Sequence, residues 1–298
     1  MKTTMTLLLL TLGLAYAMVP VSDDDSLFEA GFVEACTRDA LLALEKGADI
    51  VLPEPVPVLL LTAEEAKLRR QAYAVSLGDK VGLTAAMDSM ADLMFSGNML
   101  GRYLPDEKVV YVIEDVLLKF SGGDAERAAE KLFPVLAHEL VHAYDHQVYD
   151  CVPAPDDLET MMTDPSVLPE IQAQMSLVEG RATYASELAC LVAGVTPLMA
   201  FTVEEAMDYE MIPSDGSLAG DLASEVGNGM LRLKMVQYAQ GRTFAKRVHD
   251  FGGEKFFRQV FDSLPLGMDE LEDFSLFLIR WAEEQEEAMD EVEVEAES

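Results

Sequence analysis

The sequence predicts an α+β protein that is predominantly α-helical. Apolar residues recur at helical spacing along most of the 298 residues, whereas the composition typical of strands is found chiefly at 56–61 and 109–113. Two helix starts are marked in addition. Thr62 and Glu65 have the spacing of a capping box, and Asp124 follows two glycines at a position where it can cap the next helix.

The predicted helices share apolar residues three or four positions apart, on one face of each segment. They cover residues 27–48, 63–77, 83–95, 125–149, 169–191, 204–209, 218–239, 244–250, 254–263 and 269–287. Pro134 lies inside one of them, so we expect that helix to restart or kink there. No internal repeat or long flexible linker interrupts the pattern, and residues 18–288 are expected to form one domain, with room for two lobes.

The segment from Ala137 to Asp145 carries an HExxH signature. Positions i and i+4 lie on one face of an α-helix, so His138 and His142 can offer their imidazoles to a single metal ion. The carboxylate of Glu139 then lies beside that ion and suits removal of a proton from a bound water. Because the chain has only 4 histidines, chance would produce this spacing roughly one time in a hundred. The signature therefore predicts a metal site.

A hydrolytic zinc centre needs a third protein ligand, and Glu179 is the candidate. It is followed by Gly180, and a glycine inside a helix costs about 1 kcal/mol relative to alanine. Such a glycine is useful where another backbone comes close, and we expect it, with Ala182, to face the helix that carries the histidines. In a chain this acidic, a solvated surface residue is the alternative interpretation of Glu179. Its apolar, small-residue surroundings favour a ligand.

The HExxH motif at 138–142, followed by EGxA at 179–182, resembles the gluzincin group of zinc metallopeptidases. It is more closely similar to a set of secreted bacterial neutral zinc metallopeptidase-like proteins. Residues 101–106, before the second strand candidate, and the YxxGxxF motif at 238–244 resemble further segments of that family. The resemblance implies a zincin-like fold, in which the active-site helix packs against the glutamate-ligand helix beside a small sheet. It also implies one catalytic Zn²⁺ ion and a peptide or protein substrate.

The chain departs from the best-known gluzincins four residues after the glutamate ligand. They carry an aspartate there, which orients a histidine, whereas this chain has Thr183. A hydroxyl adds no charge, so the orienting carboxylate is expected to come from Asp145 or Glu187.

An oxyanion that forms at zinc is usually stabilised by a donor beyond the metal. We favour Tyr238 as this second catalytic residue because it opens the YxxG segment, although a core tyrosine on a helix is an equally good interpretation. Four other side chains stay open as candidates: Arg181, His146, Tyr184 and His249.

The amino terminus has the pattern of a secretory signal peptide. Lys2 precedes an apolar run at 5–14, and residues 15–17 (Ala-Tyr-Ala) place small side chains at both cleavage-determining positions. We therefore expect residues 1–17 to be removed after Ala17 and the protein to be secreted or periplasmic. The run is shorter than a membrane span of about 20 residues, so no stable membrane insertion is expected.

Acidic residues dominate the composition. The 54 Asp and Glu against 21 Lys and Arg give a formal net charge of −33. Such a surface repels phosphate backbones and anionic lipids, which argues against nucleic acid and anionic membranes as partners. Part of the charge lies at the end of the chain, and residues 289–298 are expected to form a disordered acidic tail.

The cysteine count is odd, with Cys36, Cys151 and Cys190. A bridge between Cys151 and Cys190 would tie the two ligand-bearing segments together, and unpaired thiols are the alternative.

These observations predict a secreted zinc-dependent metallopeptidase. The metal ligands are His138, His142 and Glu179, and Glu139 activates a zinc-bound water for attack on a peptide carbonyl. A metal-binding but catalytically inactive secreted protein, acting as a binding module, is the first alternative. An acidic interaction protein in which the motif is accidental is the second.

Overall fold

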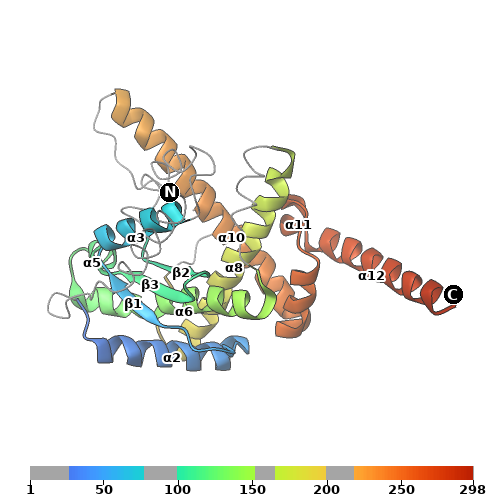
Figure 1. The fold of residues 1–298 in the computed structure, drawn as a ribbon, viewed down its shortest axis with the longest axis horizontal. Helices are drawn as coiled ribbons and strands as arrows, with labels where there is room; N and C mark the ends of the chain where they lie inside the picture. The colour runs from blue at the N-terminus through green and yellow to red at the C-terminus, as the bar shows by residue number, and fades with distance from the viewer. Residues whose placement is uncertain (1–26, 77–98, 152–164, 199–217, 298) are drawn as a thin grey trace, which may run out of the picture.

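The computed structural model describes residues 27–76, 99–151, 165–198 and 218–297. Helices dominate these residues and a small sheet lies among them, so the predicted α+β, predominantly helical class is confirmed (Figure 1). The predicted signal peptide and the predicted helices at 83–95 and 204–209 lie outside the described residues. The elements are α2 (Ala30–Ala48), β1 (Val58–Leu61), α3 (Ala63–Ser76), β2 (Gly101–Leu104), β3 (Val109–Ile113), α5 (Glu114–Phe120), α6 (Ala125–Tyr149), α8 (Leu168–Ala193), α10 (Leu218–Asp262), α11 (Met268–Glu272) and α12 (Phe274–Glu297).

The sheet has three strands in the order β1-β3-β2. β1 runs parallel to β3, with Val58 opposite Val110, and β2 runs antiparallel to it, with Gly101 opposite Val112. β3 is central, and its valines at 110 and 112 are fully buried, as expected for a strand with neighbours on both sides. Both predicted strands are present. β2 and the short helix α5 were not predicted as elements, because each is brief and its composition is mixed.

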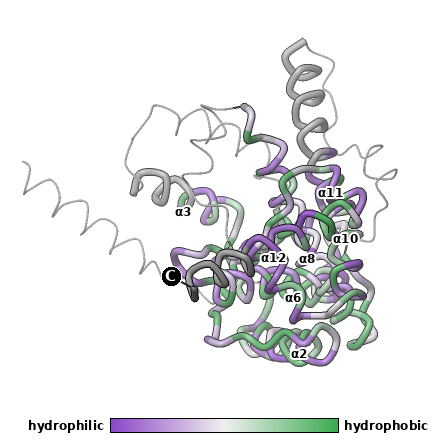
Figure 2. Tube along the Cα trace, turned by 90° about the vertical axis from the view of Figure 1, so that its right-hand side faces the viewer, coloured by the Kyte–Doolittle hydropathy of each residue, from purple (hydrophilic) through white to green (hydrophobic). Residues whose placement is uncertain are grey.

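Two clusters of buried apolar side chains hold the helices together. The first joins α2, the sheet, α5, α6 and one face of α8, and the second joins α8 to α10, α11 and α12. α2 has one buried face only, and hydrophobic and hydrophilic residues alternate along it in Figure 2. α8 contributes to both clusters, so it is the element that connects the two halves of the described structure.

α6 begins and ends at the predicted residues. The side chain of Asp124 accepts from the backbone N–H groups of Glu126 and Arg127, which caps the helix as predicted. Thr62 and Glu65 likewise form the predicted capping box at the start of α3. Pro134 is buried inside α6, and the helix runs continuously through it, so of the two alternatives, a restart or a kink, the restart does not occur.

Gly180 on α8 lies against Gly241 on α10. A Cβ atom at Gly180 would come within 1.9 Å of the Gly241 carbonyl carbon, and one at Gly241 would come within 1.6 Å of the Ser176 carbonyl oxygen. The predicted close approach of backbones is therefore present, but its partner is α10. The expectation that Gly180 faces the histidine helix was wrong. Glu179 points toward α6, whereas the next residue, Gly180, lies against α10.

α10 is longer than any helix expected from the sequence. It unites the three predicted segments at 218–239, 244–250 and 254–263, with a break in helical geometry at Gly253, whose φ of 63° and ψ of −155° suit glycine. α12 continues to Glu297 and so includes most of the predicted disordered tail. Glutamate is a good helix former, and no proline or glycine follows Gly267 to stop the helix.

The remaining sequence predictions concern the cysteines and the membrane. Cys36, Cys151 and Cys190 are free thiols, so the alternative of a bridge between Cys151 and Cys190 is not realised in this structure. None of the helices in the described ranges is both long enough and apolar enough to cross a bilayer.

Candidate metal centre

Three side chains from two helices converge where α6 packs against α8. His138 and His142 lie one turn apart on α6, and their Nε2 atoms are 3.1 Å from each other. From α8, the Oε2 atom of Glu179 lies 3.4 Å from both nitrogens. The exposed fractions of the three side chains are between 15% and 19%, so the group is open to solvent on one side. Such a set of two imidazoles and a carboxylate can hold a metal ion, and these three residues are called the metal-binding group below.

The spacing of the three ligand atoms fits zinc. Two ligands of a tetrahedral ion are separated by about 1.6 times the bond length, and zinc bonds of about 2.0–2.1 Å give about 3.3–3.4 Å. The observed separations are 3.1, 3.4 and 3.4 Å. A single point can therefore lie at bonding distance from all three atoms, with a fourth tetrahedral position left for water or substrate.

Glu139 is buried beside the two histidines and is bonded to the sheet. Its Oε2 atom accepts a hydrogen bond of 2.7 Å from the backbone N–H of Tyr103 on β2. β2 is the edge strand next to α6, and a Cβ atom at Gly101 would meet Val135 and Glu139. The absence of a side chain at Gly101 thus lets the edge strand lie close enough to hold the carboxylate.

α10 adds two side chains to the group. The ammonium of Lys234 is bonded to Glu179 through Oε1, whereas the ion pairs of Glu179 with the two histidines are made through Oε2. Its Nζ lies 5.0 Å from the ring centroid of Tyr238, which is one turn further along the helix. The Tyr238 ring in turn meets His138 edge-on, with 5.9 Å between ring centroids. The favoured tyrosine is therefore adjacent to the metal-binding group.

Neighbouring charges shift the pKa values of His142 and Glu179 in opposite directions. Burial lowers the pKa of His142, but Glu179, Glu139 and Asp145 outweigh it and the pKa is raised. Burial alone would raise the pKa of Glu179, yet Lys234 and the two histidines hold it well below its usual range. Glu179 is consequently an anion at neutral pH, as a metal ligand must be.

A second ionic cluster lies between the same two helices. Arg181, two residues after Glu179, forms ion pairs with Asp145 on α6 and Glu254 on α10. Its guanidinium lies 4.5–5.4 Å from the ring centroids of four aromatic residues, Tyr144, Tyr149, Phe257 and Phe261. Arg181 and Asp145 are almost completely buried. This cluster supplies its own cation and joins three helices.

The two predicted orienting carboxylates have cationic partners. Asp145 binds Arg181, and Glu187 binds Arg242 through two hydrogen bonds of 2.6 and 2.7 Å. Thr183 donates from its hydroxyl to the backbone oxygen of Glu179 at 2.8 Å. The threonine therefore supports the backbone of the glutamate ligand, and the structure gives it no role in orienting a histidine.

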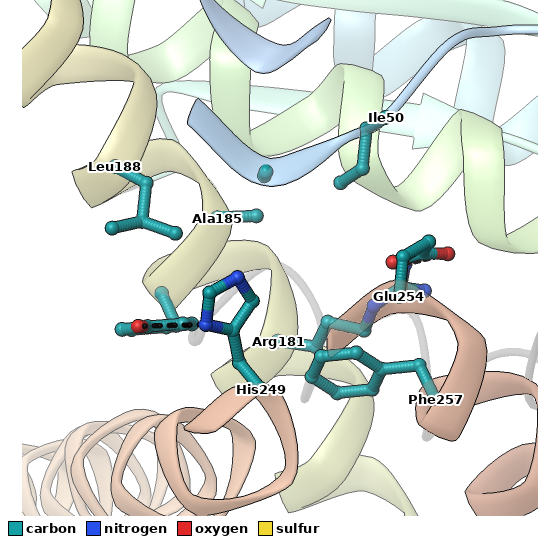
Figure 3. Close-up of a pocket in the computed structure, with 9 residues that line it drawn as sticks. Ile50, Arg181, Ala185, Leu188, His249, Glu254 and Phe257 are labelled. Carbon is teal, nitrogen blue, oxygen red and sulfur yellow. Dashed lines mark hydrogen bonds and ion pairs between the residues drawn. The ribbon is translucent and has the colours of Figure 1, made fainter. Parts of the chain in front are cut away.

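The other predicted oxyanion donors lie away from the metal-binding group or are engaged elsewhere. His146 and the Tyr103 hydroxyl are 2.8 Å apart. Tyr184 and His249 interact with one another, and they line a small pocket together with Arg181. Figure 3 shows His249 at one side of this pocket and Glu254 at the other. The residues that line it include none of the three candidate metal ligands.

Sequence reasoning missed two residues that shape the group, Lys234 and Tyr103. Lys234 precedes Tyr238 by four residues and Gly241 by seven, so all three share one face of α10. Given that Gly241 contacts α8, this spacing indicates that Lys234 and Tyr238 also face α8. The contribution of Tyr103 comes from its backbone, and no side-chain pattern could have indicated it.

Comparisons with known proteins give a likeness of fold. No protein-family model and no curated protein matches this chain. The structure is similar to the crystal structure of a protein from Chloroflexus aurantiacus that is provisionally described as a hydrolase with a novel fold, with a TM-score of 0.52. The alignment covers 91% of this chain and 95% of that one at 16% identity. An identity this low shows shared architecture alone, and the zincin-like assignment stays a prediction.

Proposed function

We propose that this protein is a secreted zinc-dependent metallopeptidase that hydrolyses peptide bonds in peptide or protein substrates. The observation that carries the proposal is the convergence of His138, His142 and Glu179 at tetrahedral spacing, partly open to solvent. The likeness to a protein provisionally described as a hydrolase agrees with a hydrolytic role. A bound zinc ion supplies a Lewis acid that lowers the pKa of a coordinated water to about 7.

Glu139 is the general base in this proposal. It follows a ligand directly on α6, and Tyr103 fixes one of its oxygens by a backbone hydrogen bond. The other oxygen is then available to take a proton from the attacking water and to deliver it to the leaving amine. The hydroxyl of Tyr238, next to His138, is the donor that stabilises negative charge on the substrate carbonyl oxygen.

The first test measures the metal. Elemental analysis of the purified protein should find one zinc per chain, and the zinc should be lost in both His138→Ala and Glu179→Ala. His249→Ala is a matched control, because His249 lines a pocket that contains none of the candidate ligands, so its loss should leave the zinc content unchanged. Zinc that survives Glu179→Ala would refute the ligand set, and a wild-type protein without metal would refute the site.

The second test measures chemistry with a peptide library. Glu139→Gln should keep zinc and reduce cleavage by about 100-fold or more, because the amide is no base. The amide oxygen can still accept from the backbone of Tyr103, so β2 should keep its place. Retained cleavage in this variant would refute the mechanism. Zinc at full occupancy in a wild-type protein that cleaves no peptide would favour the inactive binding module instead.

A further inference from the structure

The two carboxylate oxygens of Glu179 have different partners, because Lys234 binds one of them. Oε2 faces both histidines at 3.4 Å, while Oε1 is held by the Lys234 ammonium. A carboxylate without such a partner can turn both oxygens to an ion and occupy two coordination positions. The ion pair with Lys234 prevents this, because the outer oxygen would have to give up a charged partner.

The packing fixes the lysine in this place. Gly180 and Gly241 let α8 and α10 approach at backbone distance, and Lys234 lies seven residues before Gly241 on the face that Tyr238 shares. Nζ also lies 5.0 Å from the Tyr238 ring, whose negative face attracts a cation. The side chains of Lys234 and Glu179 are 23% and 19% exposed, so the ion pair is shielded more than a surface pair.

We infer that Lys234 is a positioning residue that holds Glu179 as a one-oxygen metal ligand and so keeps a coordination position open for water or substrate. The inference rests on the proposed function, since it assigns a task to a neighbour of the proposed ligands. An ion pair that served the fold alone would need only contact between the two charges. Here Lys234 contacts Oε1, while the ion pairs with both histidines use Oε2.

Cobalt(II) reports the coordination number directly, because its visible absorption weakens as ligands are added. The full-length protein and its Lys234→Met variant should each bind one Co²⁺ per chain. The wild type should have the intense spectrum of a four-coordinate ion, and Lys234→Met a spectrum at least about twofold weaker, because Glu179 then binds through both oxygens. Lys234→Arg should restore the intense spectrum, since a guanidinium can also hold Oε1.

Lys246→Met is the matched control. Lys246 lies on the same helix and pairs with Asp250 at the surface, so its loss should leave the cobalt spectrum unchanged. A wild-type spectrum in Lys234→Met would overturn the inference, and so would loss of cobalt from a variant whose circular dichroism is native. A wild type that binds no cobalt or zinc would remove the proposed function as well, whereas bound cobalt without peptidase activity would leave this inference standing.

Discussion

Two clusters of charged and ionisable side chains lie between α6 and α8, and they differ in burial and in how their charges are arranged. In the metal-binding group, two histidines and Glu179 point their ligand atoms at one another, and their side chains are partly exposed. In the Arg181 cluster the cation and the anions pair with one another, and aromatic rings surround the guanidinium. In the first group three ligand atoms face one point, with the Lys234 cation on the outer oxygen of Glu179, whereas in the second the Arg181 cation itself lies between its anions. Burial and the position of the cation therefore distinguish a candidate binding site from a structural ion-pair cluster.

The Arg181 cluster is far more deeply buried than the metal-binding group. Arg181 and Asp145 are 1% and 0% exposed, and the Oδ2 atom of Asp145 has no hydrogen-bond partner within the described part of the chain. A buried pair of this kind is costly to break, because the charge left behind has no water. Removing an ion bound by His138, His142 and Glu179 is expected to cost less, since solvent reaches these side chains.

The largest expected effect is on Arg181. Arg181→Met should lower the free energy of unfolding by about 3–5 kcal/mol, because Asp145 becomes an uncompensated buried charge. Chemical denaturation of the metal-free protein measures this. Arg242→Met is the matched control, since Arg242 also joins α8 and α10 but is 27% exposed, and its loss should cost about 0–1 kcal/mol. Equal losses in the two variants would break the comparison.

The next effect is that of the metal on stability. Zinc at about 100 times its dissociation constant should raise the free energy of unfolding by about 2.7 kcal/mol, and a chelator should remove this gain. His142→Ala should be insensitive to both additions. A stability that responds equally to zinc in wild type and His142→Ala would show that the ion binds elsewhere in this acidic chain.

The smallest effect concerns the packing that brings α10 to the site. Gly180→Ala should destabilise the protein by about 1–3 kcal/mol, because its Cβ would lie 1.9 Å from the backbone of Gly241. Gly31→Ala on α2 is the control. No atom lies within 4 Å of a Cβ there, so alanine should stabilise by up to about 1 kcal/mol. Thermal denaturation of both variants distinguishes close packing from helix propensity.

Much of the architecture could be predicted because it depends on local pattern. The bounds of α6 follow from the Asp124 cap and an apolar repeat, and β3 follows from a run of β-branched residues. The three proposed ligands could be named because two share one helix face and the third follows a distinctive motif. Their convergence in space is what the structure adds.

The rest depended on contacts between segments far apart in the chain. Glu139 and Tyr103 are 36 residues apart, and Glu179 and Lys234 are 55 apart. No local sequence pattern indicates that the two residues of either pair are in contact. The partner of Gly180 was misassigned for the same reason, since a glycine indicates that a backbone is near but not which one. Arg181 was a candidate oxyanion donor from the sequence, but its guanidinium is buried and paired with Asp145 and Glu254.

The contact between Gly180 and Gly241 also sets the position of α10 relative to α8 at the point where the two helices cross. Lys234 lies seven residues from Gly241, which is about 10 Å along a helix of about 1.5 Å rise per residue. A rotation of α10 by about 5° about this crossing would carry the lysine by about 1 Å relative to Glu179. Larger residues at the crossing are therefore expected to move Lys234 relative to Glu179 while the three proposed ligands stay the same.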